Sequence, residues 1–136
     1  MEAKELMIGD WVLYDGEPYQ IRQLGICGVN RDGEDYPAVC VGKPKGIGLI
    51  IERNEIEPIP LTEEILEKNF ERDEKRFINC NEFRDIEITE YNDGMWQVVI
   101  DEIEMSDLPT WKMYVCDVHQ LQHALKLFGI TKDITL

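Results

Sequence analysis

The segment from Asp117 to Gly129 is the stretch of this sequence whose conformation is most tightly constrained. Asp117 is a favourable helix N-cap, and Gln120 three positions later completes a capping box, in which each side chain satisfies a backbone donor near the other residue. Gly129 stands where a left-handed C-terminal cap is expected. The sequence therefore predicts a helix at residues 118–128.

The two faces of this helix differ in character. Apolar residues recur at the spacing that places them on one stripe of a helix, namely Val118, Leu121, Ala124, Leu125 and Phe128. The opposite face carries His119, Gln122, His123 and Lys126. We expect the first face to pack in a core and both histidines to face water.

The first sixty residues carry the signals of a β-meander. A β-rich run from Trp11 to Tyr14 is followed by the hairpin signal Asp15–Gly16 and by a second alternating run. Further short apolar runs follow at residues 36–41, 49–51 and 56–60. Four or five short strands in so few residues are typical of a small bent barrel, so we predict an SH3-like β-barrel at residues 1–60, by analogy of fold.

The remaining residues, 61–136, mix helix and strand signals. Thr62 is a suitable cap for a helix at residues 62–70. Alternating patterns then predict strands at residues 84–91, 95–101 and 110–116, before the helix at 118–128. The predicted fold class is α+β, with an SH3-like barrel followed by an antiparallel sheet packed with helices.

The charge of the chain excludes several classes of function. Acidic residues number 28 against 14 basic ones, so the formal net charge is −14. Such a chain repels phosphate groups, which argues against ordinary nucleic-acid binding and against an anionic membrane surface. No apolar run approaches the roughly 20 residues of a membrane-spanning helix. We expect another protein, basic or neutral, as the partner; the sequence makes no prediction of oligomeric state.

The cysteines favour a reduced, cytoplasmic protein. They are widely spaced and form no C-x-x-C pair, at Cys27, Cys40, Cys80 and Cys116. The start of the chain is charged and lacks the apolar run of a signal peptide.

A metal site can be considered around Cys116, His119 and His123, which follow a C-x-x-H-x-x-x-H pattern. The hydrolytic zinc motif places a glutamate beside its first histidine as general base, and Gln120 stands there instead. We therefore interpret both histidines as solvent-facing and predict no metal, no other cofactor and no catalytic residues. These three residues remain the metal candidates, and with a further ligand they would support a third hypothesis, a metal-dependent enzyme.

Four aromatic residues of the predicted barrel are candidates for an interaction surface: Trp11, Tyr14, Tyr19 and Tyr36. Such side chains either fill a core or line a peptide groove. The core interpretation is favoured for most of them, and any member that stays exposed is the expected contact for a partner.

Three stretches resemble one group of proteins: Glu5 to Tyr14, Ile56 to Phe70 and Val118 to Ile130. The group consists of short, acidic, uncharacterised proteins encoded in prophages and other mobile elements of gut Bacteroidetes. The resemblance implies a mobile-element origin and a bacterial cytoplasm, and it implies no activity.

The function expected from these observations is a non-enzymatic protein–protein interaction or accessory module of prophage origin. The alternative is an acidic DNA mimic that inhibits a nucleic-acid enzyme, because a patterned carboxylate surface can imitate phosphates.

Overall fold

The structure is a computed structural model that describes residues 6–80, 84–102, 111–130 and 132–136. By its internal contacts the chain divides into two compact units, Met1–Ile59 and Pro60–Leu136. We call them the N-terminal unit and the C-terminal unit. The boundary lies one residue before the one expected from the sequence.

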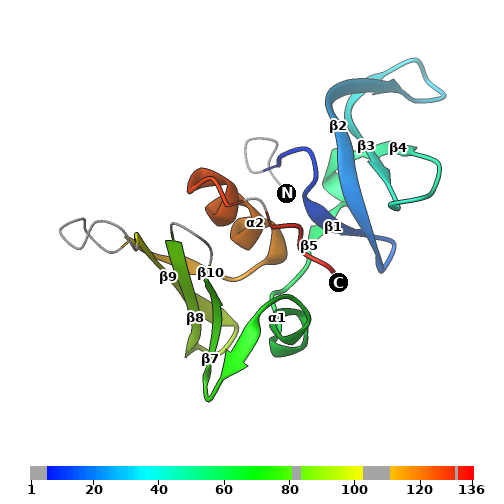
Figure 1. Cartoon of the computed structure of the whole chain (residues 1–136). Helices are drawn as coiled ribbons and strands as arrows, with labels where there is room; N and C mark the ends of the chain where they lie inside the picture. The colour runs from blue at the N-terminus through cyan, green and yellow to red at the C-terminus, as the bar shows by residue number, and fades with distance from the viewer. Residues whose placement is uncertain (1–5, 81–83, 103–110, 131) are drawn as a thin grey trace. The chain divides into compact units, whose positions relative to one another are not determined.

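The N-terminal unit is built on one five-stranded antiparallel sheet in the order β4-β3-β2-β1-β5 (Figure 1). A single 3₁₀ turn, η2, separates β4 from β5. The elements are β1 (Trp11–Tyr14), β2 (Glu17–Val29), β3 (Asp35–Gly42), β4 (Leu49–Glu52), η2 (Arg53–Glu55) and β5 (Glu57–Pro58).

Two features of β2 shape this sheet. Asp15 and Gly16 both have positive φ, 51° and 76°, which gives the tight turn that joins β1 to β2 in the hairpin twist. The ladder between β2 and β3 then shifts register on either side of Gln23, and such irregularities bend a strand. Figure 1 shows β2 curving along its length. The bent sheet encloses a core of seven side chains: Leu6, Val12, Ile21, Val39, Val41, Ile51 and Ile56.

The C-terminal unit holds a second five-stranded antiparallel sheet, in the order β10-β9-β8-β7-β6, and two helices (Figure 1). Its elements are α1 (Glu63–Asn69), β6 (Glu71–Asp73), β7 (Arg76–Cys80), β8 (Arg84–Asn92), β9 (Met95–Glu102), β10 (Trp111–Val115) and α2 (Val118–Leu127). These are the helices expected at 62–70 and 118–128 and the strands expected at 84–91, 95–101 and 110–116, together with two further strands. Among the described residues, neither helix has the length and apolar character needed to cross a membrane.

The core of the C-terminal unit combines alternate strand residues with the apolar side chains of the helices. Its members include Phe77, Ile86, Ile88, Trp96, Val98, Ile100, Leu66, Leu121 and Leu125. The buried indole N–H of Trp96 donates to the backbone carbonyl of Leu61, with an N···O distance of 3.0 Å. Near the end of the chain, the Asn69 side-chain amide bonds both the N–H and the C=O of Thr135, each at 2.7 Å. The first contact attaches the segment before α1 to the sheet, and the second attaches the end of the chain to α1.

The predicted fold class, α+β with an SH3-like barrel, is wrong. The described part of the chain is mostly β, with 52% of it in strands; its two sheets are antiparallel, its two helices are short, and the N-terminal sheet does not close into a barrel. One reason is that the hairpin of β6 and β7 was not predicted. It lies in a segment whose many charged residues obscure the alternation of apolar and polar residues that indicates a strand. Its turn contains Glu74 at a φ of 57° and no glycine, so no turn signal marked it.

Candidate interaction groove

The N-terminal unit has a hollow of about 460 Å³ that two of the predicted interaction residues line. Tyr14 and Tyr36 both line it, together with the aliphatic residues Val29, Ile50 and Ile51. Val29 and Ile50 are 63% and 61% exposed, although both are aliphatic. The hollow is therefore lined in part by aliphatic residues that are exposed to solvent.

Two neighbouring hollows share lining residues with this central one. The first, of about 570 Å³, shares Tyr14 and Glu55 and also contains Asp15 and Glu57. The second, of about 410 Å³, shares Tyr36 and is lined mainly by small and apolar residues, including Leu24, Ile26, Pro37 and Ala38. We call the three the acidic, central and apolar hollows, and together the Tyr14–Tyr36 groove.

Tyr14 is held in the groove by the core beneath it. It ends β1, is half-buried and packs against the core cluster of the N-terminal unit. Its ring is also tilted against the ring of Tyr19, with centroids 6.1 Å apart. The ring is held by the core and by Tyr19, so its position is set before any partner binds.

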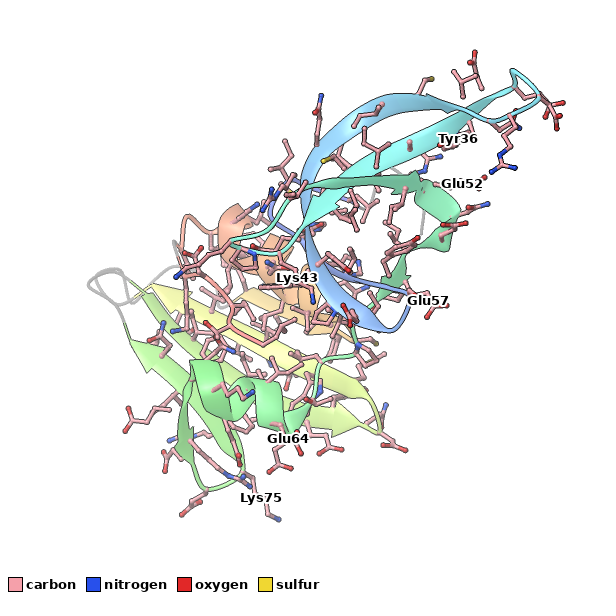
Figure 2. The ribbon with its side chains drawn as sticks, turned by 90° about the vertical axis from the view of Figure 1, so that its right-hand side faces the viewer. Tyr36, Lys43, Glu52, Glu57, Glu64 and Lys75 are labelled. Carbon is pink, nitrogen blue, oxygen red and sulfur yellow. The ribbon has the colours of Figure 1, made fainter. Side chains whose placement is uncertain are left out.

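Tyr36 is placed by a glycine on the neighbouring strand. Gly28 on β2 is its direct partner in the ladder with β3. A Cβ atom built on Gly28 would overlap the end of the Tyr36 ring, so the ring lies across this glycine. Figure 2 labels Tyr36 and Glu52, which both line the central hollow.

The charges along the groove are unequal. The acidic hollow contains the carboxylates of Asp15, Glu55 and Glu57, and no Lys or Arg lines it. Glu57 is exposed and is labelled in Figure 2. Across the part of the chain that the structure describes, no ion pair joins these three carboxylates to a base. In the central hollow, Glu52 is accompanied by Arg31.

Tyr19 is already covered by another part of the same unit. The Lys43 ammonium lies 2.9 Å from Oε2 of Glu17 and 5.3 Å from the centre of the Tyr19 ring. The hydrogen bond and the charge of Lys43 lower the pKa of Glu17, and the same contact raises the pKa of Lys43. The ring of Tyr19 thus already contacts a cation of the same unit, the ammonium of Lys43.

The four predicted interaction residues therefore separate. Tyr14 and Tyr36 line the groove, Tyr19 packs against the ring of Tyr14, and Trp11 is not among the residues that line the three hollows. Sequence reasoning missed Val29 and Ile50, because an aliphatic residue in a strand carries no signal that distinguishes an exposed position from a buried one.

The metal candidates lie on and just before α2. The expectation that His119 faces water is wrong: it is only 4% exposed and is buried like its neighbour Val118. The rings of His119 and His123 meet edge to face with centroids 5.6 Å apart, and Cys116 is half-buried. No group of three His, Cys, Asp or Glu side chains within the described residues could hold a metal ion.

Several carboxylates that a DNA mimic would display are instead engaged by bases. Arg76 pairs with Asp73 at 2.8 Å and with Glu87 at 3.3 Å. Arg72 pairs with two glutamates of α1, Glu63 and Glu67. On the C-terminal unit, basic side chains thus lie among the described carboxylates and pair with several of them. The DNA-mimic alternative stays a prediction.

Comparison of the chain with protein-family models, curated proteins and solved structures gave no match.

Proposed function

We propose that this chain is a non-enzymatic protein-interaction or accessory module of a mobile genetic element, that it works in the bacterial cytoplasm, and that the Tyr14–Tyr36 groove is its contact surface. The observation that carries the proposal is that half-buried tyrosines and exposed aliphatic residues line one hollow. The origin and the compartment rest on the resemblance to mobile-element proteins and on the cysteine pattern.

The chemistry of the groove supports binding. Tyrosine, valine and isoleucine provide contact area, and tyrosine adds a polar hydroxyl, which is why aromatic residues are enriched at the centres of interfaces. Covering apolar surface contributes on the order of 25 cal/mol per Å². Because Tyr14 and Tyr36 are already positioned, little conformational entropy is lost from their side chains when a partner binds.

Site-specific photocrosslinking tests the proposal. A benzophenone amino acid is placed at Ile50 in the groove or, as a control, at Leu127, which is 76% exposed on the C-terminal unit. Each protein is irradiated in a lysate of the bacterial group in which the resembling proteins occur. We expect a discrete adduct from position 50, lost when Tyr36→Ser is added, and no such adduct from position 127.

A binding measurement with the recovered partner completes the test. The double variant Val29→Ser/Ile50→Ser removes exposed groups, so its melting temperature should stay near that of the unmodified protein, while affinity falls by about tenfold or more. Adducts that form equally at both positions, or affinity that is unchanged in the double variant, would contradict the proposal.

A further inference from the structure

We propose that the groove binds an extended, basic segment of the partner: an apolar side chain lies in the central hollow beside Tyr14 and Tyr36, and a neighbouring Lys or Arg enters the acidic hollow. This inference rests on the proposed function and names the chemical class of the segment bound.

The first support is that the three hollows of the groove share lining residues. The central hollow shares Tyr14 and Glu55 with the acidic hollow and Tyr36 with the apolar hollow. Hollows that border the same residue can take successive side chains of an extended peptide, whose residues advance about 3.3 Å each. A bound segment can fill adjoining hollows with successive side chains without folding into a helix or a turn.

The second support is charge complementarity. Asp15, Glu55 and Glu57 line one hollow with no base within ion-pair distance of them among the described residues. Their negative potentials add, so a cationic side chain gains from all three, whereas an acidic side chain is repelled. The net charge of −14 extends the same preference to the whole molecule and speeds encounter with a basic partner.

The third support is an arrangement that the N-terminal unit already contains. Lys43 lies over the Tyr19 ring at 5.3 Å while its ammonium bonds the Glu17 carboxylate at 2.9 Å. This is a lysine held by one tyrosine and one carboxylate. The adjoining Tyr14 lines the same hollow as Glu55, Glu57 and Asp15, so a lysine or arginine there would meet the same two kinds of group.

Selection from a displayed library of random peptides on the immobilised full chain tests this inference. Selected peptides are retained only if they fail to bind the Tyr36→Ser variant, which restricts the set to groove-dependent sequences. We expect these to contain an apolar residue followed or preceded closely by Lys or Arg. Synthetic copies with the base replaced by norleucine should bind about tenfold more weakly at low salt.

A charge-matched pair of variants locates the effect. Glu55→Gln/Glu57→Gln should weaken a selected peptide about tenfold, and the loss should shrink in high salt as screening increases. Glu71→Gln/Glu90→Gln changes the net charge equally at exposed positions of the C-terminal unit and should leave the affinity unchanged.

The outcomes separate this inference from the proposed function. Groove-dependent peptides without bases, or equal weakening by both double variants, would overturn the inference and leave the interaction module intact. If no selected peptide depends on Tyr36, the proposed function itself is contradicted.

Discussion

The ring of Tyr36 lies across Gly28, the residue directly opposite it in the ladder between β2 and β3. The absence of a side chain at Gly28 is what allows the ring to occupy this place, next to the central hollow. The glycine therefore shapes the groove, although it supplies no contact group of its own.

Replacing Gly28 with Ala should change binding more than stability. The new Cβ meets the far end of the Tyr36 ring, which can rotate away, so we expect a loss of no more than about 1 kcal/mol in unfolding free energy. The displaced ring should weaken binding of a groove-dependent peptide about tenfold. Thermal melting and peptide titration measure the two effects.

Gly46→Ala is the matched control, because a Cβ there makes only ordinary contact with Lys43. If Gly28→Ala binds as well as Gly46→Ala, Tyr36 does not contribute through its position on this glycine.

Trp96→Phe should destabilise the C-terminal unit by about 1–3 kcal/mol, since it removes a buried hydrogen bond and leaves the Leu61 carbonyl without its donor. Urea unfolding followed by circular dichroism gives the change. Trp111→Phe is the control, because Trp111 is 52% exposed, and it should cost less than about 1 kcal/mol. Equal losses would mean that ring size, and not the hydrogen bond, sets the effect.

The contact of Glu17 with Lys43 should be visible as a pH dependence. The pKa of Glu17 is lowered in the folded protein, so its contribution to stability is present above the ordinary glutamate value of 4.5 and is lost as the pH falls through the lower, folded pKa. Lys43 has a raised pKa, so its contribution is present below its ordinary value of 10.5 and is lost as the pH rises through the folded pKa. The pair stabilises the fold between these two limits.

Carboxyl-carbon NMR of Glu17 checks this assignment. The variant Lys43→Met keeps the aliphatic part of the side chain and loses the charge. The pH at the midpoint of the Glu17 titration should therefore rise toward the ordinary glutamate value. The shift in the unmodified protein should also diminish at high salt, because both groups are exposed. An unchanged midpoint in Lys43→Met would show that Lys43 is not the cause.

Gln120→Ala should shorten or loosen the start of α2. The Gln120 side-chain oxygen accepts the backbone N–H groups of Cys116 at 2.7 Å and Asp117 at 3.2 Å, and its removal should cost about 1 kcal/mol. Gln120→Glu keeps an acceptor and adds a negative charge at the positive end of the helix, so it should be neutral or stabilising. Hydrogen exchange at the first turn of α2 distinguishes the two variants, and equal protection in both would contradict this role of the oxygen.

Elements marked by local chemistry could be located from sequence. In α2 the cap at Asp117, the acceptor at Gln120 and the left-handed Gly129, at a φ of 70°, are signals that act within a few residues. The hairpin of β6 and β7 has no comparable signal: its turn residue Glu74 adopts a positive φ because the paired strands require it. Its absence from the prediction is one reason why the β content was underestimated.

The sequence by itself determined the charge of the chain, the ends of its helices and the identity of the aromatic residues available for a groove, because these depend on residue type and on neighbours a few positions away. Only the tertiary structure decided that His119 is buried, that Lys43 covers Tyr19, and that Tyr36 lies on Gly28 beside the hollow reached by Tyr14. Burial and contact of this kind arise from strand register and from packing between residues distant in the chain. A pattern of residue types along one segment contains no measure of either.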